Sequence, residues 1–334
     1  MKTIMEIAFF STKSYDQVFF ERANKDYPFD LKFFKEPLTK ETAYLATGSF
    51  AVCAFVNDDL CKSTLEELKK LNIKTIALRC TGFNNLDLKA AFEMEFKVVN
   101  VPHYSPHAVA EHAVALMLAL NRKIPKAYIR SKEGNFSLDS LLGFDMNEKI
   151  VGVIGSGSIG KVLVKILLGF ECKVLCYDPK PDQSLNVSYT SLENIFKEAD
   201  IISLHCPLNP NTYHLINETS IKMMKDHVMI INTGRGGLID TKAVIEGLKN
   251  EKIGYLGIDV YEEEANLFFE DKSDRVLLDD LLVRLLMMPN VIVTSHMGFF
   301  TDKAMNTIAQ TTLLNLYDLK TKNRSNNMVI FCEC

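Results

Sequence analysis

Short apolar runs alternate with amphipathic stretches along almost the whole chain. In the first hundred residues, apolar runs predict strands at residues 3–10, 30–34, 51–55, 74–79 and 97–101. Helical patterns lie between them, such as STLEELKKL at residues 63–71. Strands that alternate with helices are typical of a parallel sheet that helices cover on both faces. The first part of the chain is therefore predicted to be an α/β domain.

A long apolar helix follows this first series. Ser105 is suited to cap it, Pro106 fits the first helical position, and the helix is predicted to run from His107 to Asn121. Apolar residues occupy more than one of its faces. We therefore expect this helix to be buried against another domain or another subunit.

A second series of strands and helices comes next. Strands are predicted at residues 149–154, 173–178, 200–206, 227–233, 255–260 and 290–296. Helices are predicted at residues 161–170, 191–199, 219–225, 240–250 and 274–286. Six strands joined by crossover helices are the composition of a doubly wound nucleotide-binding fold. A last helix, at residues 301–320, is expected to pack back on the first domain and to make that domain discontinuous.

Length and composition agree with a globular protein of two domains. A chain of 334 residues is too long for one ordinary hydrophobic core. Hydrophobic residues make up 47% and charged residues 24%, and the formal net charge is −4. This composition lacks the excess of basic residues that is typical of nucleic-acid-binding proteins, so we expect no nucleic-acid partner.

The chain carries no pattern of a membrane span or of secretion. No apolar stretch reaches the roughly 18 residues that cross a bilayer, and Glu6 interrupts the apolar start. No small-residue cleavage site follows, so the start is interpreted as a strand and not as a signal peptide. We expect a cytoplasmic protein without a membrane partner.

Cysteines and histidines give no strong metal motif. The eight cysteines include no CxxC pair, and reduced thiols are the expected state. A CxC formed by Cys332 and Cys334 favours metal capture only weakly. The other metal-type side chains fit no standard ligand spacing and are expected at a helix start: His103, His107, Glu111 and His112. We therefore expect no bound metal.

A glycine-rich turn predicts a dinucleotide site. The motif GSGSIG, residues 155–160, directly follows a predicted strand and opens a predicted helix. Glycines at such a turn let the backbone approach a pyrophosphate, and the helix start supplies free N–H groups. The next strand ends in Asp178, which lies 21 residues after Gly157. This spacing suits an acid that binds the adenosine ribose diol, and an acid there repels a 2′-phosphate. The sequence therefore favours NAD over NADP, a preference that nearby Lys180 would soften.

Three charged groups follow three later strands. Arg235 stands among glycines after one strand, Asp259 leads toward the acids at residues 262–264 after the next, and His296 ends the last. Ligands of open α/β sheets bind at the carboxyl ends of the strands, so these groups are expected in one crevice. Taken singly, each is an ordinary surface residue.

As a set, these groups suit hydride transfer to a 2-oxo acid. A guanidinium can grip the substrate carboxylate with two hydrogen bonds. A histidine can protonate the developing alkoxide, and a neighbouring carboxylate can hold the imidazole.

With these motifs, the chain resembles the D-isomer-specific 2-hydroxyacid dehydrogenases. The stretches that carry the resemblance are FVNDD, IALRCTGFNNLDL, VPHYSPHAVAEHA, VGVIGSGSIG, YDP, ISLHCPL, INTGRGGLID, GIDVYEEE and LFFEDKS. They cover nearly the whole length, and they look most like those of the fermentative, D-lactate-forming members. The resemblance implies reversible hydride transfer between NADH and pyruvate.

The resemblance also implies a fold and an assembly. It implies two doubly wound parallel-sheet domains, a Rossmann NAD domain at residues 102–298 and a smaller flavodoxin-like catalytic domain. The smaller domain is expected to be discontinuous, with residues 1–101 and 299–334. Family members usually dimerise through the NAD domain, so a homodimer or a dimer of dimers is expected, with the helix at 107–121 near the contact.

The resemblance assigns roles to individual residues. Arg235 is expected to bind the substrate carboxylate, His296 to act as acid and base, and Glu264 to be the partner of His296. The expected cofactor-binding residues are Gly155, Ser156, Gly157, Ser158, Ile159, Gly160, Asp178, Cys206, Pro207, Thr233, Gly234 and Asp259, of which Asp259 would face the nicotinamide carboxamide. The expected substrate-binding residues are Cys80, Thr81, Gly82, Tyr104, Arg235, His296 and Phe299.

Two features of the sequence depart from the family pattern, and two other functions stay open. The glycine loop has Ser158 where a bulkier residue is frequent, and Met297 stands where small or polar residues are frequent. Both bear on substrate fit more than on the reaction. The alternatives are a dehydrogenase for a bulkier 2-oxo acid and an NAD-sensing protein of the same fold without turnover.

Overall fold

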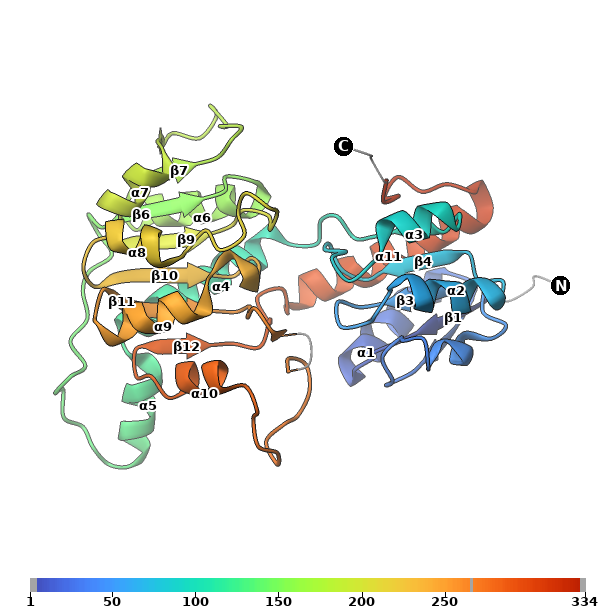
Figure 1. The fold of residues 1–334 in the computed structure, drawn as a ribbon, viewed down its shortest axis with the longest axis horizontal. Coiled ribbons are helices and arrows are strands. Elements are labelled where there is room, and N and C mark those ends of the chain that lie inside the picture. The colour runs from blue at the N-terminus through green and yellow to red at the C-terminus, as the bar shows by residue number, and fades with distance from the viewer. Residues whose placement is uncertain (1–4, 265–266, 331–334) are drawn as a thin grey trace. The chain divides into compact units, whose positions relative to one another are not determined.

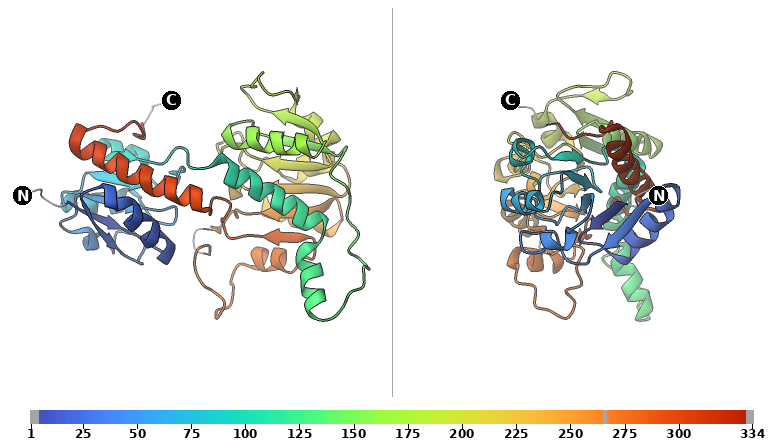
Figure 2. Two further views of the ribbon diagram at one scale, coloured as in Figure 1. Left: turned by 180° about the vertical axis from the view of Figure 1, so that it is seen from behind. Right: turned by 90° about the vertical axis from the view of Figure 1, so that its right-hand side faces the viewer.

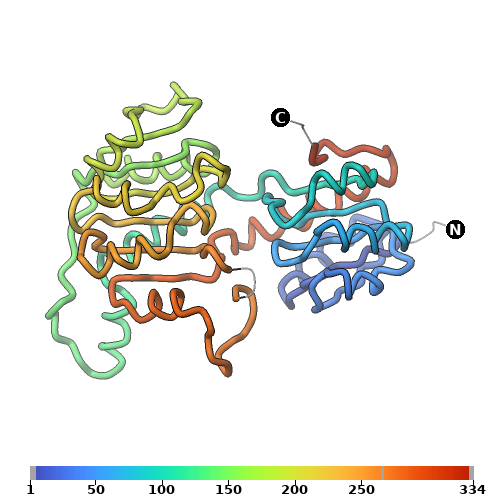
Figure 3. Tube along the Cα trace, viewed as in Figure 1, coloured from blue at the N-terminus to red at the C-terminus, as the bar shows by residue number. Residues whose placement is uncertain are grey.

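The chain forms two compact units in a computed structural model that describes residues 5–264 and 267–330. Unit 1 consists of Met1–Ser105 and Phe300–Cys334, and unit 2 of Pro106–Phe299. The chain passes from unit 1 into unit 2 once and returns with its last helix (Figure 3). The predicted α/β class, with two parallel sheets and interleaved helices, is confirmed.

Unit 1 has a five-stranded parallel sheet in the order β2-β1-β3-β4-β5 (Figure 1). Its strands are β1 (Met5–Phe9), β2 (Phe29–Phe33), β3 (Ala51–Ala54), β4 (Thr75–Leu78) and β5 (Lys97–Val99). Its helices are α1 (Ser14–Ala23), α2 (Lys62–Lys70), α3 (Leu88–Glu93) and α11 (Asp302–Lys322), with short 3₁₀ turns at Asn24–Asp26 and Ala43–Ala46. This strand order is that of flavodoxin-like sheets.

The core of unit 1 lies on both faces of this sheet. Strands β3 and β4 are buried along their whole length, which explains their continuous apolar runs. On one face, Leu65 and Leu68 of α2 pack on the sheet. On the other, Phe20 of α1 meets Phe9 of β1 edge to face at 4.7 Å. Helix α11 packs against α1, β4 and β5, so the last helix belongs to the first unit (Figure 2).

Unit 2 has a seven-stranded parallel sheet in the order β12-β11-β10-β9-β6-β7-β8. Its strands are β6 (Ile150–Ile154), β7 (Lys173–Tyr177), β8 (Ser188–Tyr189), β9 (Ile201–Leu204), β10 (Val228–Asn232), β11 (Ile253–Ile258) and β12 (Val291–Val293). Counted from β6, the order is that of a Rossmann sheet with one strand added after the sixth. Strand β8 was not predicted, because two residues carry no periodic pattern.

Helices cover both faces of the sheet in unit 2 (Figures 1 and 2). They are α4 (Pro106–Asn121), α5 (Ile124–Lys132), α6 (Ser158–Gly169), α7 (Leu192–Glu198), α8 (Glu218–Met223), α9 (Thr241–Lys249) and α10 (Asp280–Leu286), with a 3₁₀ turn at Gly236–Leu238. The helix predicted from residue 274 begins only at Asp280. Its start is fixed by Asp279, whose carboxylate accepts hydrogen bonds from the backbone N–H groups of Leu281 and Leu282.

Helix α4 is buried within its own unit. It contacts α6, β10, β11 and β12, and Gly257 of β11 lets it come close. A Cβ at Gly257 would lie 3.2 Å from Cβ of Leu116 and 3.1 Å from Cδ1 of Leu120. The apolar faces of this helix are therefore accounted for without a second subunit.

Two further observations concern membranes and thiols. Among the helices in residues 5–264 and 267–330, none combines the length and the apolar character needed to cross a membrane. The six cysteines in these residues are all free thiols, whereas Cys332 and Cys334 lie outside the described residues.

Candidate active site

The three predicted catalytic side chains follow three neighbouring strands. Arg235 comes after β10, Glu264 after β11 and His296 after β12, and these strands are adjacent in the sheet. In a parallel sheet their carboxyl ends share one edge, which is where ligands of open α/β sheets bind. The structure therefore places all three residues in loops at the same edge of unit 2.

The loop that carries Arg235 is fixed from beneath by a buried amide. The side chain of Asn232 accepts a hydrogen bond from the Gly234 N–H at 3.0 Å and donates one to the Arg235 carbonyl at 2.8 Å. Gly236 permits contact with the next loop, because a Cβ there would lie 2.1 Å from the carbonyl carbon of Tyr261. The backbone of the Arg235 loop is thus held between β10 and the loop after β11.

The guanidinium of Arg235 is half-buried and has spare donors. One of its N–H groups donates to the Gly234 carbonyl at 2.8 Å. Among the residues that the structure describes, no carboxylate lies within ion-pair distance of it. A half-buried cation without an anionic partner is suited to bind one from a ligand.

His296 and Glu264 form a hydrogen-bonded pair. Nδ1 of His296 lies 2.9 Å from Oε1 of Glu264, and the two side chains are 19% and 22% exposed. The other carboxylate oxygen accepts a hydrogen bond from the Tyr261 N–H at 2.9 Å, which fixes the acid. Within the described part of the chain, Nε2 of His296 has no hydrogen-bond partner. That nitrogen is therefore available to exchange a proton with a substrate.

The other two acids of this loop do not reach His296. Glu262 lies 2.5 Å from Nε2 of His214 and accepts a hydrogen bond from the Thr241 hydroxyl at 3.0 Å. Glu263 is exposed. Of the acids at 262–264, only Glu264 contacts the imidazole.

Asp259 holds the backbone around His296. His296 adopts a left-handed conformation with φ of 54°, and its N–H donates to the Asp259 carbonyl at 2.7 Å. The buried carboxylate of Asp259 accepts hydrogen bonds from the N–H groups of Met297 at 2.9 Å and Gly298 at 2.8 Å. The turn that presents the imidazole is therefore built on this carboxylate.

Two side chains further stabilise the ionised Asp259. The Thr294 hydroxyl donates to it at 2.5 Å, and Nε2 of His112 lies 3.3 Å from the same oxygen. Burial would raise the pKa of Asp259, but the hydrogen bonds from His112, Thr294 and Gly298 hold it below its usual value. Its carboxylate is engaged inside unit 2, and its predicted role toward the nicotinamide stays a prediction.

Two aromatic rings flank the imidazole of His296. The centroid of Phe269 lies 5.7 Å from it, and that of Phe299 lies 6.4 Å from it. Phe299 was predicted at the site and Phe269 was not, although Phe269 lies in LFFEDKS, one of the stretches that carry the family resemblance. The pair of phenylalanines within that stretch was the signal available.

The glycine loop has the geometry that a dinucleotide needs. Gly155 has φ of 98°, and a Cβ there would lie 2.6 Å from the His205 carbonyl. A Cβ at Gly160 would lie 2.0 Å from the Gly155 oxygen, so the turn closes tightly onto α6. At Gly157 a Cβ would meet nothing within 4 Å. The open side of the loop lies next to the first N–H groups of α6, which have no partner within the helix itself, so it suits a phosphate.

Asp178 lies against this loop. One of its oxygens accepts from the Ser156 N–H at 2.8 Å and from the Ser156 hydroxyl at 3.1 Å, and the other accepts from the Lys180 N–H at 2.8 Å. Partial burial would raise the pKa of Asp178, but these hydrogen bonds hold it below its usual value. The acid is therefore ionised beside the loop, and its predicted binding of the adenosine ribose stays a prediction.

Two buried polar atoms at the neighbouring strand ends have no hydrogen-bond partner among the residues that the structure describes. They are Nδ1 of His205, after β9, and the hydroxyl oxygen of Thr233, after β10. Burial lowers the pKa of His205 to about 4, so its ring is neutral at pH 7. Such atoms are satisfied by a ligand or by water, so the residues present fit a bound dinucleotide.

The substrate-binding residues predicted before residue 105 belong to unit 1. Cys80, Thr81 and Gly82 follow β4, where the Thr81 hydroxyl donates to the Val101 carbonyl at 2.8 Å. Tyr104 lies just before α4. Their joint action with the residues of unit 2 stays a prediction.

Sequence reasoning missed a buried cation beneath this loop of unit 1. The guanidinium of Arg79 is almost fully buried and lies 3.5 Å from Oδ1 of Asp16. It also donates to the Ser11 carbonyl at 2.9 Å. Arg79 therefore anchors the start of the loop that carries Cys80.

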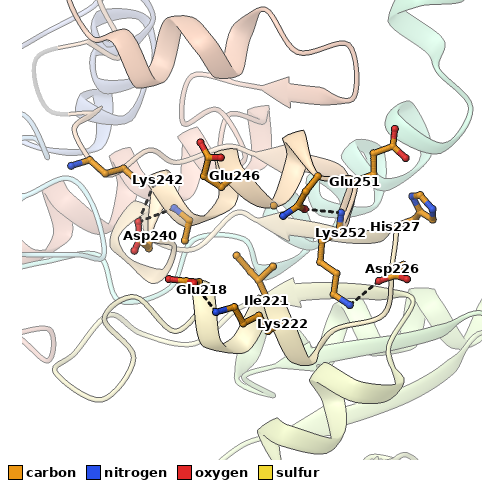
Figure 4. A pocket seen from close by; sticks show the side chains of 13 residues that line it. Glu218, Ile221, Lys222, Asp226, His227, Asp240, Lys242, Glu246, Glu251 and Lys252 are labelled. Atoms are coloured by element: carbon orange, nitrogen blue, oxygen red, sulfur yellow. Dashed lines mark hydrogen bonds and ion pairs between the residues drawn. The ribbon is translucent and has the colours of Figure 1, made fainter.

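A surface groove of about 880 Å³ lies elsewhere on unit 2, along α8 and α9 (Figure 4). Acids and lysines alternate along it, and several pair with each other, such as Lys222 with Glu218 at 2.6 Å and Lys252 with Asp226 at 2.8 Å. None of the predicted site residues lines it. In residues 5–264 and 267–330, no group of three or more His, Cys, Asp or Glu side chains is placed to hold a metal ion.

Comparisons with known proteins agree on one family. Residues 114–298 match the family described as D-isomer specific 2-hydroxyacid dehydrogenase, NAD binding domain. The chain is 52% identical over 319 residues to a D-lactate dehydrogenase of Escherichia coli, with 95% of this chain and 97% of that relative covered.

Solved structures give the same result over nearly the whole chain. The apo-structure of D-lactate dehydrogenase from Escherichia coli matches with a TM-score of 0.89 and 49% identity, covering 98% of this chain and 100% of that one. A D-lactate dehydrogenase with NAD⁺ from Lactobacillus jensenii matches with a TM-score of 0.82 and 32% identity, with the same coverage.

Proposed function

The chain belongs to the D-isomer-specific 2-hydroxyacid dehydrogenase family, and from this premise we propose that it is an NAD-dependent D-lactate dehydrogenase. The reaction is the reversible reduction of pyruvate to D-lactate. The observation that carries the proposal is the His296–Glu264 pair, with Nε2 of His296 unengaged, at the sheet edge that also holds Arg235. The names of the relatives support pyruvate and D-lactate as the substrates.

Each of the three side chains has one task in this reaction. Bound NADH supplies the hydride that reduces the oxo carbon. Arg235 binds the substrate carboxylate with its spare N–H donors and orients the oxo group. His296 donates the proton from Nε2 to the oxo oxygen, and in the reverse direction it takes that proton from the hydroxyl. Glu264 binds the other ring nitrogen, Nδ1, and holds the ring in place.

We propose that unit 2 holds NAD through its glycine loop and the adjacent strand ends. The cofactor-binding residues are then Gly155, Ser156, Gly157, Ser158, Ile159, Gly160, Asp178, Cys206, Pro207, Thr233, Gly234 and Asp259. Support comes from the open side at Gly157 and from the unpartnered atoms of His205 and Thr233. The relative solved with NAD⁺ supports the same cofactor.

We propose that unit 1 is the substrate domain. The loop after β4 then helps to hold the substrate carboxylate through the backbone at Cys80, Thr81 and Gly82. Tyr104 and Phe299 border the substrate. The hydrogen bond from Thr81 to Val101 and the anchoring of Arg79 support a loop of fixed shape.

We also propose a cytoplasmic homo-oligomer. Exposed apolar side chains gather in and after α5 in unit 2, a surface that a second copy of the chain would cover: Ile124, Tyr128, Ile129, Phe136, Leu138 and Leu142. Apolar surface of this kind marks an association site more often than a solvated face. The free thiols of the described residues fit a reducing compartment.

The test is NADH oxidation by the purified protein with a panel of 2-oxo acids. Pyruvate is expected to give the highest kcat/KM, and chiral analysis should find the D-isomer of lactate. A higher kcat/KM with a bulkier acid would move the assignment to another member of the family. Absence of turnover with every acid, together with tight NADH binding, would favour an NAD-sensing protein instead.

A further inference from the structure

The segment after β7 is tied to the glycine loop by a chain of hydrogen bonds. The Tyr189 hydroxyl donates to the Ser156 hydroxyl at 3.0 Å, and Ser156 in turn donates to Asp178 at 3.1 Å. The backbone N–H of Asp182 donates to the Tyr189 hydroxyl at 3.0 Å. Asp182 is thereby held near the acid that is expected to bind the adenosine ribose.

Asp182 forms an ion pair with Lys161, which lies on α6 directly behind the glycine loop. The Lys161 and Asp182 side chains are 43% and 27% exposed. The hydrogen bond from Lys161, with further bonds from Ser184, holds the pKa of Asp182 well below its usual range. Lys161 also lowers the pKa of Asp178 through its charge, so it acts on the ribose-binding acid as well.

We propose that Asp182 is a specificity-determining residue for the cofactor, because it neutralises Lys161 and so keeps that cation from stabilising a phosphate on the adenosine ribose. The inference rests on the use of NAD by unit 2. Asp178, Asp182 and Lys161 together carry one net negative charge, which disfavours the 2′-phosphate of NADP. The charge of nearby Lys180 softens this effect, but it is the same with and without Asp182. Without the Asp182 charge the three positions sum to zero, and Lys161 is free to pair with the phosphate.

Asp182 acts through Lys161 and is therefore a positioning residue. Its test compares two ligands that differ only in the 2′-phosphate, because this is the group that a freed Lys161 would bind. Calorimetry with AMP and with adenosine 2′,5′-bisphosphate measures this difference without any turnover. In Asp182→Asn, binding of the bisphosphate is expected to tighten roughly threefold to tenfold, the range for a partly exposed lysine that gains a doubly charged partner. Binding of AMP should change less than twofold.

A matched control removes another lysine-paired carboxylate from the same unit. Asp226 pairs with Lys252 at 2.8 Å and lies before β10, at the opposite end of the strands from Asp182. Asp226→Asn changes the net charge by the same amount and should leave both affinities unchanged. Adding Lys161→Met to Asp182→Asn should abolish the gain in bisphosphate binding.

Two outcomes would overturn the proposal. One is an equal gain for Asp182→Asn and Asp226→Asn, which would mean that only net charge matters. The other is a gain that survives in the double variant, which would mean that Lys161 is not the phosphate partner. Failure of the unmodified protein to bind AMP or NADH would instead contradict the use of NAD itself.

Discussion

Replacement of Arg235 gives the sharpest test of the proposed chemistry. Its loop is fixed by Asn232 and packed on Tyr261, so a substitution that keeps the backbone should change only the guanidinium. Only one of its N–H groups is used within the loop. In Arg235→Gln the substrate carboxylate loses a cation and two charged hydrogen bonds at a half-buried position.

The expected loss follows from these contacts. A hydrogen bond to a charged group contributes about 1.5–3 kcal/mol, and a fork of two contributes about 3 kcal/mol or more. Partial exposure of Arg235 favours the lower end of this range. Since about 1.4 kcal/mol corresponds to a factor of ten, kcat/KM for pyruvate should fall roughly 10²-fold in Arg235→Gln. Arg235→Lys keeps the charge but loses the fork, so it should raise KM and lower kcat by less.

The assay is steady-state pyruvate reduction combined with fluorescence titration of NADH. Affinity for NADH should stay near that of the unmodified protein in both variants. Arg284→Gln is a matched control, because it removes an exposed arginine from α10 of the same unit and should leave kcat/KM unchanged. A near-normal KM for pyruvate in Arg235→Gln would refute this role and leave Arg235 as an ordinary surface residue.

Four other predictions concern the remaining charged residues and the exposed apolar surface. His296→Ala should lower kcat by roughly 10²–10⁴, the usual share of general acid–base catalysis. Glu264→Gln should also lower kcat, because the imidazole loses the carboxylate that holds it, and an unchanged kcat would contradict the pairing. Asp178→Ser should weaken NADH binding and raise kcat/KM for NADPH relative to that for NADH, measured by steady-state kinetics with both cofactors. Equal use of NADH and NADPH by the unmodified protein would contradict this role of Asp178. The pKa of Asp259 is lowered in the folded state, so its ionised carboxylate stabilises the fold above the unfolded pKa, and this stabilisation is lost as pH falls through the folded pKa. Asp259→Asn should therefore lower Tm at pH 7 and make Tm fall less steeply as the pH is lowered. Parallel curves of Tm against pH for the two proteins would contradict this prediction. Leu138→Asp should lower the mass of the protein in solution, measured by light scattering, toward the 37.7 kDa of a single chain. An oligomer that persists in this variant would mean that the subunits contact each other through another surface.

Much of the fold follows from local patterns in the sequence. Alternation of apolar runs and amphipathic stretches is a short-range property, and it located the long strands and most helices within a few residues. It failed where the local signal is weak. Strand β8 has two residues, and the start of α10 is set by the capping carboxylate of Asp279 and not by hydrophobic period.

The sequence by itself also placed the charged candidates at strand ends. The chain path fixes which residue follows which strand, so Arg235, His296 and the acids at 262–264 were expected at one sheet edge. The spacing from Gly157 to Asp178 likewise follows from one turn, one helix and one strand. These are consequences of connectivity, which the sequence contains directly.

Only the tertiary structure decided which groups meet. Glu264 contacts His296 because the Tyr261 N–H fixes its carboxylate, whereas Glu262 is drawn to His214. The conformations of the loops between strands also decide that Asp259 accepts the hydrogen bond from Gly298 and that the ring of Phe269 lies beside the imidazole. Loops carry no period that a pattern can detect, and their shape is set by hydrogen bonds to residues distant in sequence. For that reason the sequence determined the strands, the glycine turn and the candidate residues, and the tertiary structure decided their pairing.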